Sequence, residues 1–558
     1  MAPDQASTRR TSDGNRLPRT HITYDVETGG AIEKRELPFV VGILADLSGN
    51  GSLVKAPTLE NRAFVDIDRD HFDALLGSLQ PRITFTVQSA LSGRIEPLNI
   101  ELTFKIFSDF SPEKILGQVP ELKDISSDQV HAQLNLILHS KPLQALEASW
   151  RGLHQLVMNT ETGPLLTLRL LDVTKEELRL DLESAVDFDQ SLLFQRVSEP
   201  RDGTLCGSPF GVLLGDYAFG RDTAEIQMLT GLSNVAAAVH APFLTAASPA
   251  MFNLQGFDDL NRPRELSKLF ESPECIDWLA FRDSENSRYV AMMVPRYLAR
   301  PPYDAQNWPV PGMPTFTEDV HVSDVILADD PKAALYTDPD KFLWGNAAWL
   351  LAQRITEAFA RHHWCAAIQG IEGGGAVSGL PVYAFNTRRG GLAAESATEV
   401  GISDDREQEL ENLSFIALCY RESANAAVFF GSQTTNRPKR YFNVETDACA
   451  RLGSLLPYIL ATSRFAHYIE AIMRSKIGSF MTRANVESYL NNWIAGYVLL
   501  DDNATQKINA QYPLREANIV VTDVPGQPGR YLATVFLRPH FQLEELTVSI
   551  RVVVELPK

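Results

Sequence analysis

The stretch LRPHFQLEELTVSIRVVVELPK, residues Leu537–Lys558, carries a regular strand pattern. From Leu546 onward every second residue is apolar, which is the pattern of a β-strand with one covered face. These residues are Leu546, Val548, Ile550, Val552, Val554 and Leu556. The unpaired edge of a long strand recruits other chains, so natural proteins seldom leave one exposed. The pattern therefore predicts a partner strand, which the rest of the sequence has to supply.

Composition limits the classes of protein to which the chain can belong. Its 558 residues suffice for about three or four domain-sized units. The 51 Lys and Arg residues against 70 Asp and Glu residues give a formal net charge of −19, which disfavours binding to nucleic acid or anionic lipid. Five scattered cysteines without a C-x-x-C pair suit a reducing compartment, and no apolar run reaches the roughly 18 residues of a membrane span. We therefore expect a cytoplasmic protein without membrane insertion.

The N-terminal part of the chain predicts an arm followed by a small α/β unit. Residues 1–20, MAPDQASTRRTSDGNRLPRT, lack the apolar core of a secretory signal and are expected to be flexible. Within residues 21–123, the alternation at Ile22–Glu27 predicts a strand, and ELPFVVGILADLSGNG predicts a buried one. Proline at position 112, after Ser111, indicates the start of a helix.

Residues 124–558 predict a larger α/β block. Strand signals at LLTLRLLDV, FGVLLGDYAF, APFLTAAS and YVAMMVPRYL alternate with helical stretches. Two strong helical patterns follow, FLWGNAAWLLAQRITEAFARHH and a long one that starts at ACARLGSLLPYIL, before a hairpin over Tyr531–Leu556. The expected fold is α/β, with mixed sheets and helices, in a small N-terminal unit and a larger block.

Two motifs invite a chemical interpretation. Gly373–Gly375 in IEGGG could line an anion-binding nest, which would make the chain a nucleotide-binding enzyme. The loop lacks the lysine and hydroxyl of a P-loop, so tight turns or close backbone packing explain its glycines better. The RHHWC stretch places His362, His363 and Cys365 together, but a second ligand pair is missing, so a helix end with a basic last turn is favoured over zinc.

Several long motifs resemble the sheath proteins of the type VI secretion system. ITYDVETGGAIEKRELPFVVGILADLSG, RAFVDIDRDHFDALL and DFSPEKI are similar to TssB, the small sheath protein. LQALEASWRGLHQLV, RYVAMMVPRYLARPPY, FLWGNAAW and ILATSRFAHYIEAIMRSKIGSFM are similar to TssC, the large one. The resemblance covers nearly the whole chain, and the motifs occur in the expected order. It implies that TssB and TssC are fused here, as a TssB-like domain over residues 21–123 and a TssC-like domain over 124–558.

The resemblance implies a structural protomer without catalytic residues, metals or cofactors. Copies are expected to stack as a helical sheath around an Hcp inner tube, attached to baseplate components, and to contract and propel the tube. The junction between the two parts is short and omits the terminal helices expected of the separate proteins. Those helices form the layer that the ClpV unfoldase recognises, so recycling by ClpV is not expected here.

The resemblance also supplies a partner for the terminal strand. In the family, strands of neighbouring protomers complete a shared sheet, and we expect the N-terminal strand to pair with the C-terminal hairpin across different copies. Flexible segments at Asp13–Thr20 and Gly526–Arg530 would let the sheet stay paired while the protomers move. The residues expected to make these contacts are Ile22, Tyr24, Val26, Val548, Ile550, Val552 and Val554.

Overall fold

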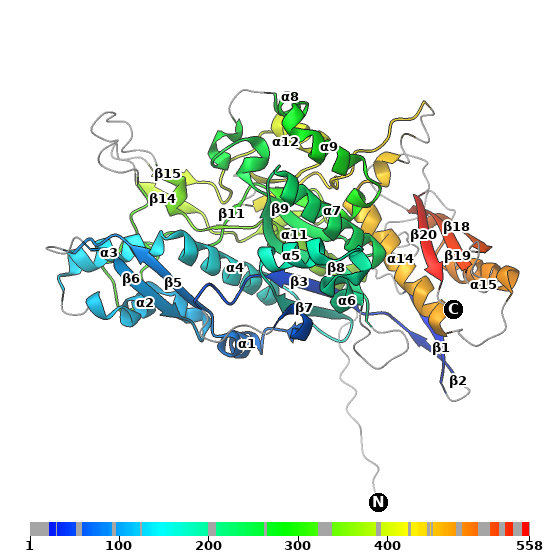
Figure 1. Cartoon of the computed structure of the whole chain (residues 1–558), viewed down its shortest axis with the longest axis horizontal. Coiled ribbons are helices and arrows are strands. Elements are labelled where there is room, and N and C mark those ends of the chain that lie inside the picture. The colour runs from blue at the N-terminus through cyan, green and yellow to red at the C-terminus, as the bar shows by residue number, and fades with distance from the viewer. Residues whose placement is uncertain are drawn as a thin grey trace, which may run out of the picture.

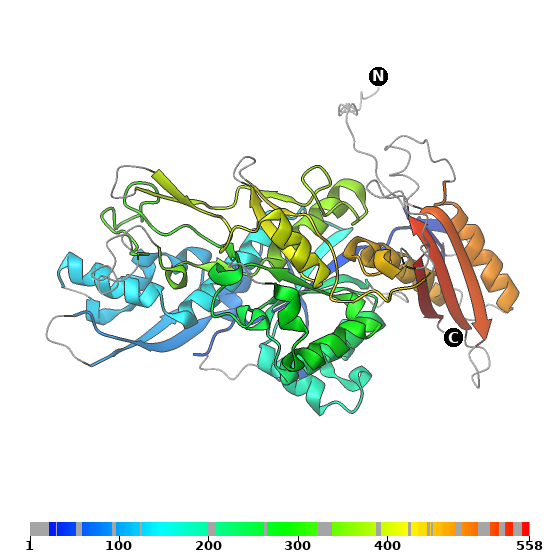
Figure 2. The ribbon, with the colours of Figure 1, turned by 90° about the horizontal axis from the view of Figure 1, so that it is seen from above.

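The computed structural model shows an elongated molecule with a large central sheet, a helical and hairpin region at one end and a small sheet at the other (Figures 1 and 2). The residues described are 22–28, 31–51, 58–91, 96–122, 125–198, 208–261, 265–321, 337–386, 392–421, 426–442, 447, 450–475, 482–499, 514–523, 531–539 and 550–556.

The described strands and helices follow one another in a mixed α/β order, so the predicted fold class is confirmed. The strands are β1 (Tyr24–Thr28), β2 (Ala31–Arg35), β3 (Phe39–Ala45), β4 (Val65–Ile67), β5 (Arg82–Val87), β6 (Leu98–Thr103), β7 (Leu166–Asp172), β8 (Phe210–Phe219), β9 (Phe243–Ala247), β10 (Val290–Val294), β11 (Tyr297–Leu298), β12 (Trp344–Gly345), β13 (Ala376–Ser378), β14 (Tyr383–Asn386), β15 (Leu392–Glu395), β16 (Ile416–Arg421), β17 (Ala426–Phe429), β18 (Leu514–Asp523), β19 (Tyr531–Pro539) and β20 (Ile550–Leu556). The helices are α1 (Phe72–Leu79), α2 (Pro112–Gln118), α3 (Ser127–Leu138), α4 (Lys141–Met158), α5 (Lys175–Ser184), α6 (Leu192–Ser198), α7 (Thr223–Ala238), α8 (Leu266–Phe270), α9 (Ile276–Asp283), α11 (Ala348–His362), α12 (Asp404–Asn412), α14 (Leu456–Ser475) and α15 (Arg483–Ala495).

The central sheet has nine strands in the order β13-β17-β16-β10-β9-β8-β3-β7-β4. Its inner strands, from β16 to β7, run parallel, whereas β4, β13 and β17 pair antiparallel with their neighbours. Parallel strands are usually covered by helices on both faces, and their sequences then read as continuous apolar runs. The predicted strands of the larger block, β7 to β10, all lie in this sheet.

Strand β3 comes from the N-terminal unit and lies in the middle of this sheet. It is parallel to β7 on one side and to β8 on the other, with Val41 opposite both Leu168 and Val212. Phe39, Val41, Ile43 and Ala45 face one core layer, whereas Val40 and Leu44 face the other. The two predicted parts of the chain therefore share one sheet.

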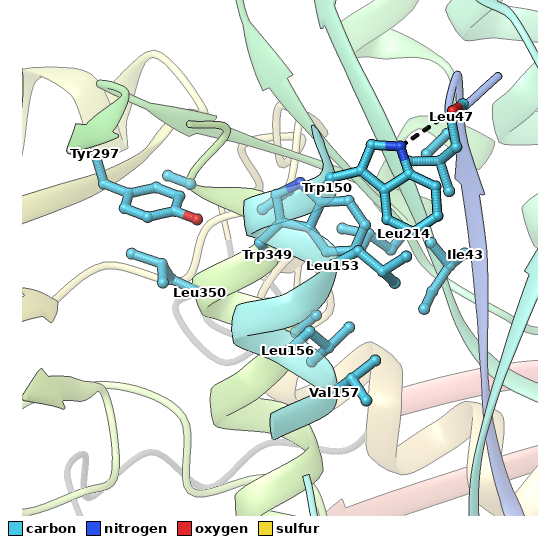
Figure 3. Close-up of a cluster of buried hydrophobic side chains, with 14 of the residues drawn as sticks. Ile43, Leu47, Trp150, Leu153, Leu156, Val157, Leu214, Tyr297, Trp349 and Leu350 are labelled. Atoms are coloured by element: carbon cyan, nitrogen blue, oxygen red, sulfur yellow. Dashed lines mark hydrogen bonds between the residues drawn. The ribbon is translucent and has the colours of Figure 1, made fainter. Parts of the chain in front are cut away.

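Helices α4 and α11 cover one face of the sheet and fix β3 beneath them (Figure 3). The buried Trp150 of α4 donates a hydrogen bond from Nε1 to the carbonyl oxygen of Leu47, just after β3, over 3.1 Å. Gly152 lets α4 approach α11 closely, because a Cβ atom there would lie 2.4 Å from the Trp349 ring. Close packing of this kind makes a core sensitive to small changes in side-chain volume.

A hairpin of β5 and β6 extends from the central body with α1, α2 and α3 around it (Figure 1). Helix α2 starts at Pro112, with Ser111 as its N-cap residue, so the predicted helix start is confirmed.

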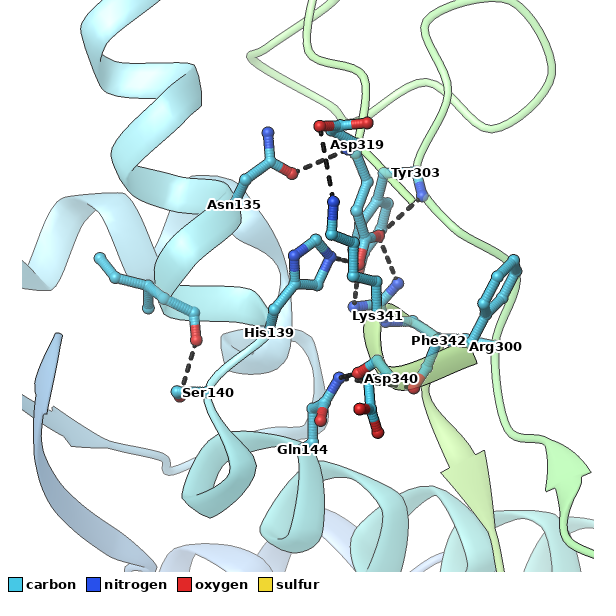
Figure 4. Close-up of polar contacts among 12 residues, drawn as sticks. Asn135, His139, Ser140, Gln144, Arg300, Tyr303, Asp319, Asp340, Lys341 and Phe342 are labelled. Carbon is cyan, nitrogen blue, oxygen red and sulfur yellow. Dashed lines mark hydrogen bonds and ion pairs between the residues drawn. The ribbon is translucent and has the colours of Figure 1, made fainter. Parts of the chain in front are cut away.

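A buried ionic network fixes the segment after β11 to α3 and α4 (Figure 4). Arg300 Nε donates to Glu147 Oε1 over 2.8 Å, and Arg300 Nη1 donates to Glu318 Oε2 over 2.7 Å. All three side chains are buried, and His139 Nε2 lies 3.3 Å from Glu318 Oε1. Burial would raise the pKa of Glu318, but the charges of Arg300 and His139 outweigh it and lower the pKa to about 2.

The C-terminal region forms a separate antiparallel sheet in the order β18-β19-β20, flanked by α14 and α15 (Figure 2). The predicted hairpin is confirmed for β19 and β20, which pair from Tyr531↔Leu556 to Leu537↔Ile550. The long helical pattern predicted from ACARLGSLLPYIL onward contains two helices, α14 and α15. Strand β18 was not predicted. Val548, the arm 1–20 and the segments Asp13–Thr20 and Gly526–Arg530 lie outside the described residues.

Candidate inter-subunit site

The N-terminal strand is one half of the candidate site. Strand β1 begins at Tyr24, two residues later than predicted, and pairs with β2 in a hairpin whose register places Val26 opposite Glu33. Ile22 and Tyr24 are buried in a third hydrophobic cluster, together with residues of α14, α15, β18 and β19. The N-terminal strand and the C-terminal strand β20, which were expected to meet, thus both pack on α14.

Three aromatic side chains hold the residues around β1. Trp493 Nε1 donates to the carbonyl oxygen of Thr23 over 2.9 Å, and Tyr497 accepts from the Thr23 N–H at 3.0 Å. The ring of Tyr24 packs edge-on against Tyr468, with ring centroids 6.1 Å apart. Polar atoms of the rings therefore satisfy the Thr23 backbone, while their apolar parts cover the start of the strand.

Two polar side chains of α14 hold the connection between β2 and β3. The hydroxyl of Tyr468 accepts from the Leu37 N–H over 3.0 Å. Arg464 donates to the carbonyl oxygen of Pro38 over 2.9 Å and also to that of Leu37. Helix α14 therefore fixes the backbone at the point where the N-terminal hairpin enters the central sheet.

The outer edge of β18 is covered by α15. Asn491 Nδ2 donates to the carbonyl oxygen of Ile519 over 2.7 Å, and its Oδ1 accepts from the Ile519 N–H at 2.9 Å. Glu487 Oε2 accepts from the Val521 N–H at 2.9 Å. Because these backbone groups already have partners, another strand cannot pair with β18 through Ile519 or through the Val521 N–H.

Strand β20 lies at the opposite end of this sheet, and β19 is its one strand neighbour among the described residues. Ile550, Val552 and Val554 pair in register with Leu537, Val535 and Ala533 of β19. Within one chain, β1 and β20 belong to separate sheets, and α14 packs against both (Figure 1). The predicted strand residues, apart from Val548, are therefore placed in the N-terminal segment and β20, but the structure does not join them in one sheet.

The residues that hold the site were not predicted. Tyr468, Arg464, Trp493 and Tyr497 lie more than 400 positions from the N-terminal residues they contact. The one available signal was the concentration of aromatic residues within the helical pattern, which does not specify a partner. Strand β18 lacks strict alternation, since Arg515 to Asn518 are not buried, and this explains why its pattern was missed.

The two motifs with chemical interpretations have structural roles. Gly374 has φ +94°, and a Cβ atom at Gly375 would lie 2.5 Å from the carbonyl oxygen of Phe429, so close backbone packing is confirmed. Helix α11 ends at His362 with Arg361 and His362 in its last turn, so the helix-end interpretation of RHHWC is also confirmed.

Helix α14 is also fixed to the central body by a buried histidine. The ring of His467 is 3% exposed, and its Nε2 atom lies 3.0 Å from the carbonyl oxygen of Val239, just after α7. His240 follows Val239, and its ring centroid lies 6.3 Å from that of His467. Burial lowers the pKa of His467 to about 3 and that of His240 to about 4, so both rings are neutral at neutral pH.

A His467→Gln variant should lose less stability in acid than the unmodified chain. An unfolded histidine takes up a proton below its ordinary pKa of about 6.5, whereas the folded ring does so only near 3, so stability is lost as the pH falls through this window. The amide group of a glutamine side chain can also donate a hydrogen bond to the carbonyl oxygen of Val239, but it does not titrate. Between pH 7.5 and 5, denaturant unfolding should show a loss about 2 kcal/mol smaller for the variant.

Two other buried titratable groups also contribute to the pH dependence of stability. Burial raises the pKa of Glu470 to about 7, an effect of opposite sign that is present in both proteins and cancels. A His240→Gln variant should also lose less stability in acid, because burial lowers the pKa of His240 to about 4. Parallel profiles for the His467 variant and the unmodified chain would refute the assignment.

No described helix is long and apolar enough to cross a membrane. The described residues also hold no group of three or more His, Cys, Asp or Glu side chains able to bind a metal ion.

Models of protein families match most of this chain, and they describe tail sheath proteins and a type VI secretion system protein. Residues 123–436 match the family EvpB/VC_A0108, tail sheath N-terminal domain, and residues 445–556 match its tail sheath gpW/gp25-like domain. Residues 12–164 match the family Type VI secretion system, VipA, VC_A0107 or Hcp2. The chain belongs to the EvpB/VC_A0108 tail sheath family and carries a VipA region at its N-terminus.

Two relatives from Pseudomonas aeruginosa strain PAO1 match the two parts. The type VI secretion system sheath protein TssC1 is 41% identical over 429 residues, which are 76% of this chain and 83% of that protein. The sheath protein TssB1 is 41% identical over 111 residues, 20% of this chain and 63% of that protein. The contracted helical sheath of the anti-feeding prophage is similar at 8% identity and a TM-score of 0.36, covering 98% of this chain and 97% of that one. The matched families and the two Pseudomonas relatives make this chain a structural protomer of a contractile sheath, with TssB and TssC fused, rather than an enzyme.

Proposed function

We propose that copies of this chain assemble into a helical sheath around an Hcp-type inner tube and contract to propel it. The N-terminal segment of one copy and the C-terminal hairpin of another would form a shared sheet, through backbone hydrogen bonds and side chains that fix the register. A contact between two different surfaces repeats without closing and therefore builds an open helix.

The observation that supports this proposal is a difference between the two edges of the terminal sheet: one is bonded by side chains of α15 and the other is formed by β20. Side chains of α15 occupy the outer edge of β18, which leaves β20 as the edge at which a strand can be added. The β1–β2 hairpin, packed on the same α14, is the natural donor of such a strand. Tyr24, Val26, Ile550, Val552 and Val554 would set the register, with Val548 and Ile22 at its ends.

The wider setting of the sheath is part of the same proposal. We place the sheath in the bacterial cytoplasm, attached to baseplate components, and divide the chain into an arm (1–20), a TssB-like domain (21–123) and a TssC-like domain (124–558). The connection from α2 to α3 runs only from Val119 to Ser126, which supports the short junction expected between the two parts. Recycling would then not use the terminal helices that a ClpV-type unfoldase recognises.

Removal of either terminal strand should abolish tube formation while the central sheet of the protomer stays folded, although the deletion also removes the buried Ile22 and Tyr24. The two variants are a deletion of residues 1–28 and a double substitution, Val548→Pro with Ile550→Pro, which removes two backbone donors. Negative-stain imaging of lysates should show long tubes for the unmodified chain and none for either variant. Circular dichroism and sedimentation of the purified variants should show a folded monomer.

A control separates pairing from a general effect of proline. Val520→Pro places the same residue on the exposed side of β18, in the same sheet, away from the proposed edge. Tubes should persist in this control, although the protomer is less stable. Normal sheaths from either terminal variant would show that these strands do not connect the copies.

A further inference from the structure

The structure places an exposed cationic tip between the two tail sheath regions. The tip consists of Lys439, Arg440, Tyr441 and Phe442, which lie after the first matched region and before the second. The Phe442 side chain is fully exposed, and Tyr441 is 47% exposed. Lys439 and Arg440 are also exposed and form no ion pair with any described residue. An exposed aromatic pair beside two cations is unusual on a chain with a net charge of −19.

The base of the tip is held rigidly. Asn436 Nδ2 donates to the carbonyl oxygen of Ser284 over 2.8 Å, and the Arg437 N–H donates to the carbonyl oxygen of Arg282 over 2.9 Å. The Arg437 guanidinium also pairs with both carboxylate oxygens of Asp283 at the end of α9. A fixed base reduces the conformational entropy that docking would cost, so the tip is presented as a preformed contact.

A second surface of the chain has the opposite character. The acidic apolar face runs from the last turn of α5 into the following 3-10 helix Phe188–Gln190 and exposes Leu180, Val186 and Phe188. Leu180 is 52% and Val186 85% exposed. Asp187 and Asp189 flank Phe188, are exposed and have no ion pair among the described residues.

Neighbouring charges on α5 do not neutralise these two aspartates. Arg179 is the one cation on that turn, and it already pairs with Glu176 and Glu183. No hydrogen bond, ion pair or ring contact joins the tip to the acidic apolar face within the described part of one chain. Both surfaces are therefore available to a partner.

We propose that the cationic tip of one copy docks on the acidic apolar face of a second copy. Lys439 and Arg440 would pair with Asp187 and Asp189, while Phe442 and Tyr441 cover Val186 and Phe188. Aromatic and arginine side chains at the centre of an interface commonly dominate its affinity. The two surfaces differ, so the contact is heterologous and adds to an open helical array. The inference rests on the sheath function but uses none of the terminal strands.

A charge exchange tests the contact. Lys439→Glu with Arg440→Glu should lower the number of tubes per lysate image at least about tenfold, because like charges then face each other. Asp187→Lys with Asp189→Lys should do the same. Copies that carry all four substitutions should restore at least about half of the tubes, because the paired charges are again opposite.

Two further variants test whether net charge alone, or the exposed ring of Phe442, affects assembly. Lys105→Glu with Lys114→Glu changes the net charge equally at exposed positions on the β6–α2 side and should leave the tubes unchanged. Phe442→Ser removes an exposed ring that supports no fold contact, and it should lower the tube number while the melting temperature stays constant. Sedimentation velocity of the same set, below the concentration at which tubes form, reports the pairwise contact directly.

The outcomes separate this inference from the terminal-strand proposal. Normal assembly of the tip variant, an equal loss in the Lys105/Lys114 control, or failure of the fourfold exchange to restore association would each overturn it. The last result would assign the tip to another partner, such as the inner tube. Loss of tubes only on deletion of residues 1–28 would leave the terminal-strand proposal standing and the tip contact refuted.

Discussion

An Arg300→Met variant should lose about 3–5 kcal/mol of its free energy of unfolding, because loss of the guanidinium leaves the buried Glu147 with Arg151 alone and the buried Glu318 with His139 alone as ion-pair partner. Arg300 is 6% exposed and lies between Glu147 and Glu318, which are 0% and 2% exposed. Burial lowers the pKa of Arg300, but the charges of Glu147 and Glu318 outweigh this effect and raise it well above its usual value. Methionine fills a similar volume and provides no charge.

The loss should be recovered in part by removing the carboxylates as well. Arg300→Met combined with Glu147→Gln and Glu318→Gln should regain part of the stability, since neither buried carboxylate then carries a charge, although Arg151 loses its partner Glu147. Arg179→Met is the matched control, because this partly exposed arginine also pairs with two carboxylates, and the denaturation midpoint of the variant should not move. Equal losses for Arg300→Met with and without the Gln substitutions would mean that packing, not charge, sets the cost.

Residues 124–558 expressed alone should fail to form a stable protein. This fragment lacks β3, all seven residues of which are buried between β7 and β8. Burial of six apolar side chains contributes about 10 kcal/mol, comparable to the whole stability of a domain. The fragment should therefore aggregate on expression, as measured by its fraction in the pellet.

Co-expression of residues 1–123 with 124–558 should restore a stable complex. The parallel pairing of β3 depends on its side chains and backbone, and fusion serves to raise the local concentration of the two parts. A chain that lacks only residues 1–20 is the control and should fold as the full chain does. Cooperative unfolding of 124–558 as a monomer would contradict the central role of β3.

The strands of the central sheet could be predicted because burial on both faces leaves a strong sequence signal. Phe39–Ala45 reads as an uninterrupted apolar run, Phe210–Phe219 as one interrupted by Asp216, and each occupies an inner position. That the first of these runs would lie between β7 and β8 could not be deduced from periodicity, which gives the element but not its neighbours.

Contacts between distant polar residues could not be predicted at all. Arg300 and Glu147 are 153 positions apart, and both belong to a chain with 121 charged residues, so neither stands out. The same holds for Asn491, whose side chain meets the backbone of Ile519 only because α15 packs beside β18. Such pairings arise from tertiary structure rather than from local preference.

The edge of β18 that α15 covers has a consequence for how a sheath stays ordered. A sheet with two receptive edges could join to further sheets on both sides and grow sideways into a ribbon, as aggregating proteins do. Asn491 and Glu487 bond the β18 backbone at Ile519 and Val521, so among the described residues β20 is the end of the terminal sheet at which we propose that a strand is added. A sheath protein is present in many copies at high local concentration. A blocked edge would protect it from aggregation through successive sheets and would limit each terminal sheet to one added strand.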